Sequence, residues 1–183
     1  MVGRQARGTL AVPTAVQSGD YLTAIAGRGY GTVFRTSSDG VVGVVANQTF
    51  TATAHGAYLT FETTPDDSVT RTEKMRVSAA GGVSIGNSYV GTNAGANNLA
   101  VAGLVGIGTT VPATGVHLDV QHATNPTIGI KKTNATTRQW YIQAVSNNLA
   151  INLSGNQATG INITNSGFVG VGITAPLVTL VAS

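Results

Sequence analysis

The chain has 183 residues, of which 42% are hydrophobic and only 9% are charged, and it contains no cysteine. This charged fraction is far below the roughly 25% of a typical soluble domain. The hydrophobic content nevertheless excludes an intrinsically disordered chain. The 24 glycines keep no three-residue period, which excludes collagen. The absence of cysteine excludes disulfides, thiolate metal sites and cysteine nucleophiles. No segment has about 18 consecutive apolar residues and no signal peptide is visible, so we expect no membrane insertion.

Short strands separated by turns follow one another along the chain. Alternation of apolar and polar residues predicts strands at 41–46, 57–63, 116–120, 140–145, 149–153 and 161–163. Turn residues fall between these strands, at 38–40, 64–67, 146–148, 154–156 and 165–167. The abundant Gly, Thr, Asn, Ser and Val are poor helix formers. Together these patterns predict an all-β fold.

An internal repeat accompanies these strands. Met75–Gly86 aligns without a gap with Ile161–Gly172 at an offset of 86 residues (161 minus 75), and Leu99–Gly108 is a shorter copy. In each copy apolar residues alternate onto one strand face, whereas Gly or Ser on the other face lets a second backbone approach closely. The last glycine permits a positive φ, which ends the strand.

Charged residues are missing from two long stretches, 77–118 and 139–183. On a symmetry axis a charged residue would face its own copies, and like charges in a low dielectric are costly. Neutral Asn and Thr can instead hydrogen-bond to their copies, and Val and Ile can pack. We therefore predict a homotrimer whose axis is packed by repeat residues Val83, Ile85, Val105, Ile107, Val169 and Val171. A monomeric β-protein of low charge is the alternative.

The repeats divide the chain into two predicted modules, 1–86 and 111–183. A connector at 87–110 is rich in Gly, Ala and Asn and contains no charged residue. The predicted fold is therefore an all-β, intertwined homotrimeric fibre, with two β-sandwich-like or prism-like modules joined by this neck.

Candidate catalytic and metal-binding residues are sparse. His117 and Asp119 share a strand face and His122 follows, but zinc needs about three or four well-placed ligands. Glu62 and Glu73 belong to the one carboxylate cluster, and two carboxylates can hydrolyse a glycosidic bond. The other members of that cluster, Asp66 and Asp67, follow a proline in a turn, where Asp is expected. We predict no catalytic residue, no metal and no cofactor, and hence a protein that is not an enzyme.

Binding candidates are also few. The ten basic residues are scattered, whereas nucleic-acid binding favours a dense basic stripe, so no nucleic-acid partner is expected. Tyr58, Trp140 and Tyr141 are candidate contacts for a glycan, because neighbouring rings fall on opposite strand faces and one of them can stack on a sugar. Packing at a subunit contact is the alternative. Gly27–Gly31 is interpreted as a glycine-rich turn.

Several stretches resemble tail-fibre and spike proteins of tailed bacteriophages, a family in which an intramolecular chaperone domain often follows the fibre. The stretches that carry the resemblance are Pro13–Asp20, Gly27–Gly31, Ala54–Pro65, Arg71–Val77 and Val105–Pro112. The resemblance implies a homotrimeric β-fibre on a virion that acts in host attachment. We expect no chaperone domain within these 183 residues.

The predicted function is thus a structural component of a phage tail fibre or spike, located in the virion tail and extracellular after release. Its expected partners are its own copies, other tail or baseplate proteins and a host-surface polysaccharide. The alternatives are a bacterial trimeric surface adhesin, a polysaccharide-cleaving tailspike, and a collar, baseplate or capsid decoration protein.

Overall fold

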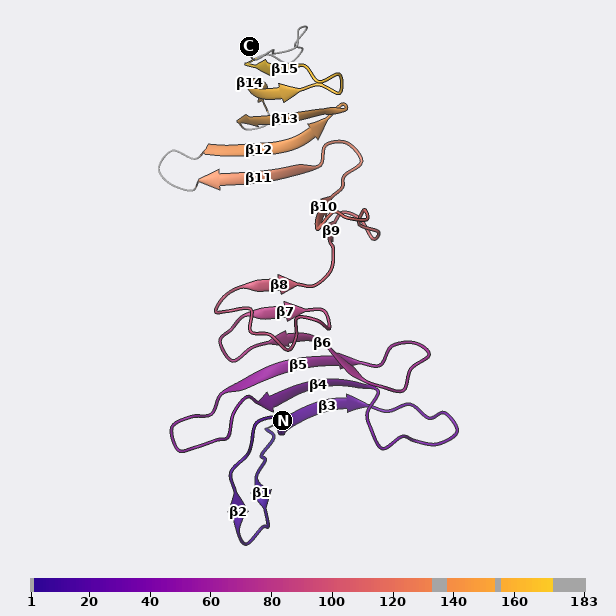
Figure 1. Cartoon of the computed structure of the whole chain (residues 1–183), viewed down its shortest axis with the longest axis vertical. Helices are drawn as coiled ribbons and strands as arrows, with labels where there is room; N and C mark the ends of the chain where they lie inside the picture. The colour runs from indigo at the N-terminus through magenta and orange to yellow at the C-terminus, as the bar shows by residue number, and fades with distance from the viewer. Residues whose placement is uncertain (1, 133–137, 154–155, 173–183) are drawn as a thin grey trace. The chain divides into compact units, whose positions relative to one another are not determined.

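The chain is all-β in a computed structural model that describes residues 2–132, 138–153 and 156–172. These residues form fifteen strands and no helix (Figure 1). The prediction of an all-β fold is therefore confirmed. Within the described ranges no helix is long and apolar enough to span a bilayer.

Two compact units make up the chain, Met1–Gly103 and Leu104–Ser183. Their boundary falls inside the connector that was predicted at 87–110. Part of that stretch, Leu99–Val101, adds a strand to the main sheet of the first unit. Each unit is described by itself below.

The first unit holds a two-stranded ribbon and one six-stranded sheet. The ribbon pairs β1 (Arg7–Gly8) with β2 (Pro13–Thr14). The sheet follows chain order, with β3 (Tyr21–Gly27), β4 (Gly40–Ala46), β5 (Ala57–Thr63), β6 (Thr72–Val77), β7 (Val83–Ile85) and β8 (Leu99–Val101). All its neighbours are antiparallel except β7 and β8, which are parallel.

The second unit likewise holds one short pair of strands and one larger sheet. A short parallel pair joins β9 (Val105–Ile107) to β10 (Leu118–Val120). An antiparallel sheet follows, with β11 (Thr127–Lys132), β12 (Arg138–Val145), β13 (Asn148–Leu153), β14 (Asn156–Ile163) and β15 (Val169–Val171). Each unit thus has one large sheet, and its described residues do not form the two packed sheets of a sandwich. A prism would need sheets from further copies.

The sequence repeat is also a structural repeat. The backbone N–H of Gly86 donates to the carbonyl of Lys74 at 2.8 Å, and that of Gly172 donates to Gly160 at 2.8 Å, so the bond recurs at the 86-residue offset. Both terminal glycines have a positive φ, of 100° and 70°. The glycine that ends the shorter copy, Gly108, has a φ of 76°. These values confirm that glycine ends each repeat strand in a left-handed conformation.

We expect Gly108→Ala to lower the free energy of unfolding by at least about 2 kcal/mol. A left-handed conformation costs an L-residue about 1–2 kcal/mol, and the added Cβ would collide with the carbonyl oxygen of Gln121. Gly103→Ala is the matched control, because no atom lies within 4 Å of its Cβ position and its φ is not positive. Urea unfolding of both variants checks the expectation, and equal losses would contradict it.

Candidate functional site

The six-stranded sheet has one continuous apolar face. One row of directly paired residues crosses all six strands as Ile25, Val42, Phe61, Met75, Ile85 and Val101. The next row consists of Thr23, Val44, Leu59, Val77, Val83 and Leu99. We call these two rows apolar face 1. Alternate residues of a strand point to the same side of the sheet, so the two rows share one face. Eleven of the twelve side chains on this face are hydrophobic.

Apolar face 1 is not covered within its own unit. Ile25 is 78% exposed and Leu99 is 66% exposed. The buried valines of β4 are Val41 and Val45, which alternate with Val42 and so lie on the opposite face. The small core of the unit therefore sits behind the sheet, and the larger apolar area lies open.

The opposite face of this sheet carries ion pairs. Glu62 accepts hydrogen bonds from Arg71 Nε at 2.6 Å and from the Tyr21 hydroxyl. Arg76 binds both carboxylate oxygens of Glu73, at 2.7 and 2.5 Å. Removing these groups from water would be costly. A partner can therefore cover apolar face 1 without desolvating the ions, which lie on the other side.

The protonation states of this network favour a structural role. Burial raises the pKa of Glu62, but hydrogen bonds from Tyr21 and Arg71 outweigh it, and its pKa lies below the ordinary value. Burial and the bond to Glu62 raise the pKa of Tyr21 to about 12. A glycosidase acid needs a raised pKa. Because Glu62 and Glu73 are each held by an arginine, they act as ion-pair partners.

The five-stranded sheet also has one continuous apolar face. A row of isoleucines ends in a valine, as Ile128, Ile142, Ile151, Ile161 and Val171. A second row consists of Ala144, Leu149, Ile163 and Val169. We call these rows, with Ile130 and its partner Trp140, apolar face 2. Val171 is 74% exposed, so this face too is open in a single chain.

Four of the six residues predicted to pack on an axis fall on these two faces, and the other two lie on the short pair β9–β10. Val83 and Ile85 belong to apolar face 1, and Val169 and Val171 belong to apolar face 2. Val105 and Ile107 form β9, and Ile107 is 54% exposed. None of the six is buried within its own chain. Packing on an axis remains a prediction for all six.

The three aromatic residues proposed for glycan contact are separated. Trp140 lies on apolar face 2, whereas its neighbour Tyr141 points to the opposite side of β12. Tyr58 lies on the charged side of the first sheet, where the Arg76 guanidinium lies 4.0 Å from its ring centroid. One face of the Tyr58 ring is therefore occupied, and glycan contact remains a prediction for all three.

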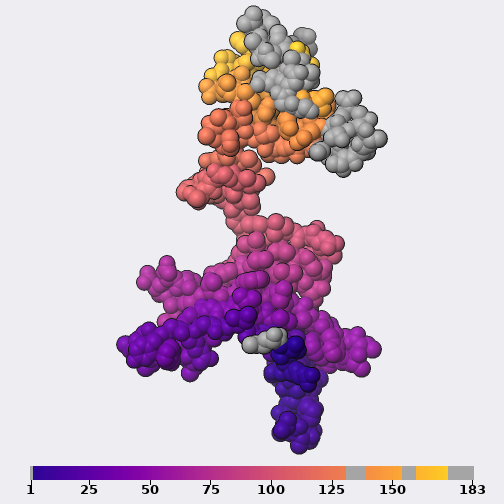
Figure 2. Space-filling view, turned by 180° about the vertical axis from the view of Figure 1, so that it is seen from behind, coloured from indigo at the N-terminus to yellow at the C-terminus, as the bar shows by residue number. Residues whose placement is uncertain are grey.

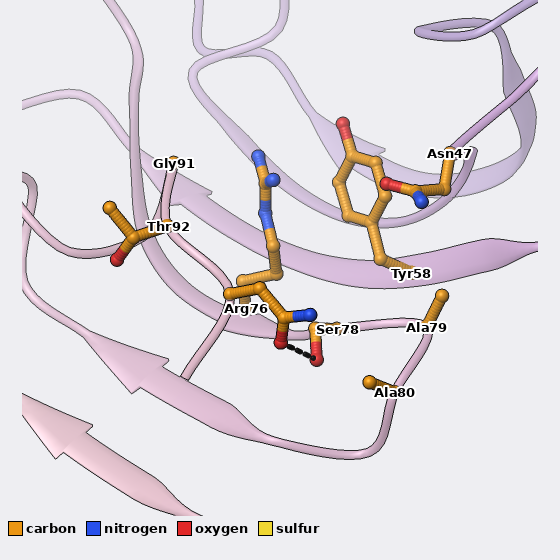
Figure 3. A pocket seen from close by; sticks show the side chains of 9 residues that line it. Asn47, Tyr58, Arg76, Ser78, Ala79, Ala80, Gly91 and Thr92 are labelled. Carbon is orange, nitrogen blue, oxygen red and sulfur yellow. Dashed lines mark hydrogen bonds between the residues drawn. The ribbon is translucent and has the colours of Figure 1, made fainter. Parts of the chain in front are cut away.

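Tyr58 and Arg76 line a small polar pocket of about 130 Å³ (Figure 3). The pocket lies between Asn47 on one side and Gly91 and Thr92 on the other. Its volume is well below the roughly 300 Å³ of small ligand sites. Because Glu73 neutralises Arg76, the pocket has little attraction for an anion.

The histidine and aspartate candidates have local roles. One carboxylate oxygen of Asp119 accepts the Ala113 N–H at 2.7 Å and the Gln121 side chain at 2.8 Å, which holds the loop before β10. His122 Nδ1 accepts the N–H of Thr124 at 3.3 Å. Across the described ranges no three His, Asp or Glu side chains are grouped to hold a metal ion.

Sequence reasoning missed an aromatic pair in the loop between β3 and β4. The ring centroids of Tyr30 and Phe34 lie 5.2 Å apart in an edge-to-face arrangement. The stretch Gly27–Gly31 was interpreted only as a glycine-rich turn. The available signal was two aromatic residues four positions apart around a glycine.

Comparison with known proteins gave matches among solved structures. No protein-family model and no curated protein matches the chain. The chain is similar to the carboxy-terminal domain of the bacteriophage T5 L-shaped tail fibre, with a TM-score of 0.46, 13% identity and coverage of 97% of this chain and 91% of that chain. It is also similar to the same domain with its intramolecular chaperone domain, with a TM-score of 0.47, 12% identity and coverage of 100% of this chain and 64% of that chain.

We expect Glu62→Gln to lower the free energy of unfolding by about 1–3 kcal/mol, because a partly buried Arg71 would lose its charged acceptor. Asp67→Asn is the control, because Asp67 lies in an exposed turn with a φ of 55°, which Asn also tolerates. Urea titration at fixed protein concentration measures the free energy of unfolding of both variants. An unchanged stability of Glu62→Gln would show that the ion pair has no structural role.

The segment before β3 is held by a second ion pair. Arg7 Nε and Nη2 bind the two oxygens of Asp20 at 2.7 and 2.6 Å, and Gln17 donates its backbone N–H to Asp20 at 2.9 Å. The Arg7 bonds, followed by the Gln17 bond, lower the pKa of Asp20 from 3.8 to about 2.

We expect Asp20→Asn to lower the thermal unfolding midpoint at pH 7. Because the folded pKa of Asp20 is depressed, its stabilisation is present above pH 3.8 and is lost as the pH falls through about 2. The midpoints of the variant and the parent should therefore converge below pH 2. Asp66→Asn should match the parent at pH 7 and below pH 2, and a gap for Asp20→Asn that persists below pH 2 would contradict the assignment.

Proposed function

We propose that the chain is a structural subunit of a phage tail fibre, that three copies assemble around a common axis, and that the assembly acts in host attachment. The observation that carries the proposal is the pair of open apolar faces on single-layer sheets. The resemblance of the sequence to phage fibre proteins supplies the biological setting. The ion pairs on the opposite face of the first sheet support an arrangement in which the charged face points away from the trimer axis and the apolar face points toward it.

Assembly follows from the energetics of a one-layer sheet. A sheet with one apolar face must bury that face against another layer. The first unit supplies no second large sheet among its described residues. Each Val, Leu or Ile that becomes fully buried contributes about 1.5–3 kcal/mol. A second and a third copy of the same face provide the missing layers.

The short parallel pair β9–β10 supports intertwining between copies. Each of its strands has three residues, and an isolated two-stranded sheet is at best marginally stable in water. In this proposal Val105 and Ile107 meet their copies around the axis. The neck is then stable because the chains associate.

Attachment by such a fibre depends on a rigid assembly that presents the same binding loops on each of its three chains. Three identical weak contacts held on one assembly gain in strength through their high effective concentration. In this proposal the partners are other copies, tail or baseplate proteins and a host-surface polysaccharide. The fibre lies on the virion tail and carries out no reaction.

Sedimentation tests the assembly. We expect the parent protein to sediment at three times 18.5 kDa. Val42→Asp should abolish the trimer, because it would place three carboxylates among aliphatic side chains at a cost of several kcal/mol. Val69→Asp, the same change at an exposed loop position, should leave the trimer intact.

Circular dichroism shows whether each variant keeps its β-structure. A parent protein with the mass of one or two chains would overturn the proposed trimer. Intact trimers for both variants would show that apolar face 1 is not the assembly surface.

A further inference from the structure

A ring cluster stands on the loop between β3 and β4. Tyr30 and Phe34 are 69% and 66% exposed, and Val33 between them is also exposed. Tyr30 and Phe34 also form an isolated backbone bridge. The loop appears as a separate dark purple lobe of the first unit in Figure 2. We call Tyr30, Val33 and Phe34 the ring cluster.

Asp39 braces this loop through several hydrogen bonds. Its carboxylate accepts the Gly29 N–H at 2.7 Å and Arg35 Nη1 at 3.0 Å, and its own N–H donates to Gly27 at 2.8 Å. Arg35 also donates to the carbonyl of Val69, in the neighbouring loop between β5 and β6. The exposed rings are therefore mounted on a braced loop, and a preorganised surface loses little entropy on binding.

The polar groups around the rings suit a neutral partner rich in hydroxyl groups. Arg28, Thr32 and Thr36 are exposed and have no side-chain hydrogen bond or ion pair within the described part of the chain. In an edge-to-face pair the ring that presents its edge keeps its own faces free, and those faces attract weakly positive C–H groups. A saccharide offers both parts, with C–H patches for the rings and hydroxyls for Arg28 and the threonines.

The charges nearby disfavour an anionic surface. Asp66 and Asp67 lie on the loop that Arg35 ties to the cluster, and both are exposed without an ion-pair partner among the described residues. Two exposed carboxylates on this neighbouring loop outnumber the exposed guanidinium of Arg28 on the ring-cluster loop, and the net negative charge disfavours a phosphate-rich layer. A second copy of the chain is also disfavoured, because the cluster lies in a loop outside the aliphatic rows of apolar face 1.

We propose that the ring cluster binds a neutral saccharide of the host surface. Tyr30 and Phe34 contact the sugar ring, and Arg28 donates hydrogen bonds to its hydroxyls. This inference rests on the proposed attachment function and deepens it, because it specifies a neutral saccharide and gives the ring cluster as its site. Display on three copies strengthens a weak single contact.

A binding assay with the full chain tests the site. The probe is immobilised polysaccharide extracted from a bacterial strain to which the protein adsorbs. We expect Tyr30→Ala and Phe34→Ala each to weaken binding about tenfold, equivalent to about 1.4 kcal/mol. Tyr30→Phe should bind like the parent. Tyr89→Ala is the matched control, because Tyr89 is an exposed tyrosine on another loop, and its binding should be unchanged.

The outcomes separate this inference from the proposed function. If the parent adsorbs to cells and the Tyr30→Ala/Phe34→Ala double variant binds equally well, the ring cluster is not the site but the attachment role stands. If the double variant sediments with a different mass, the cluster is a contact between copies and the inference is wrong. Binding abolished by moderate salt would identify an anionic ligand and also overturn it. A parent protein that adsorbs to no cells would overturn both proposals.

Discussion

A sheet one layer thick with a single apolar face cannot complete its own core, and the architecture of this chain depends on that constraint. Rows of aliphatic residues cross both large sheets and remain open in a single chain, as Ile25 and Val171 show. The ionised groups of the first sheet lie behind it, so its two faces differ in chemistry. In the proposed assembly, further copies bury the apolar rows and leave the charges in water.

Glycine placement lets the same small unit recur along the chain. A strand of three residues ends at a glycine in the left-handed region, as at Gly86 and Gly172. The following chain can then turn and begin a new strand, which lies parallel to the first at β7–β8 and at β9–β10. A short strand buries little by itself, so the repeat is consistent with the proposed association of copies.

The carboxylates considered as catalytic or metal-binding candidates make contacts that stabilise the fold. Glu62 and Glu73 are each bound by an arginine, and Asp119 holds a loop. In the proposed function, recognition falls to loops at the ends of the strands, because loops are exposed and the sheet holds them in place. The braced loop between β3 and β4, with Tyr30 and Phe34, has both properties.

Strand alternation and turn residues were sufficient to predict the all-β class, most strand positions and the repeat, because each depends on neighbours along the chain. They also placed Val83 and Ile85 on one strand face. The tertiary structure alone decided that six strands align these residues into an uncovered face, since cross-strand register joins positions far apart in sequence. It alone paired Glu62 with Arg71 and braced the ring cluster through Asp39. Those contacts depend on where loops meet in space, which local periodicity does not encode.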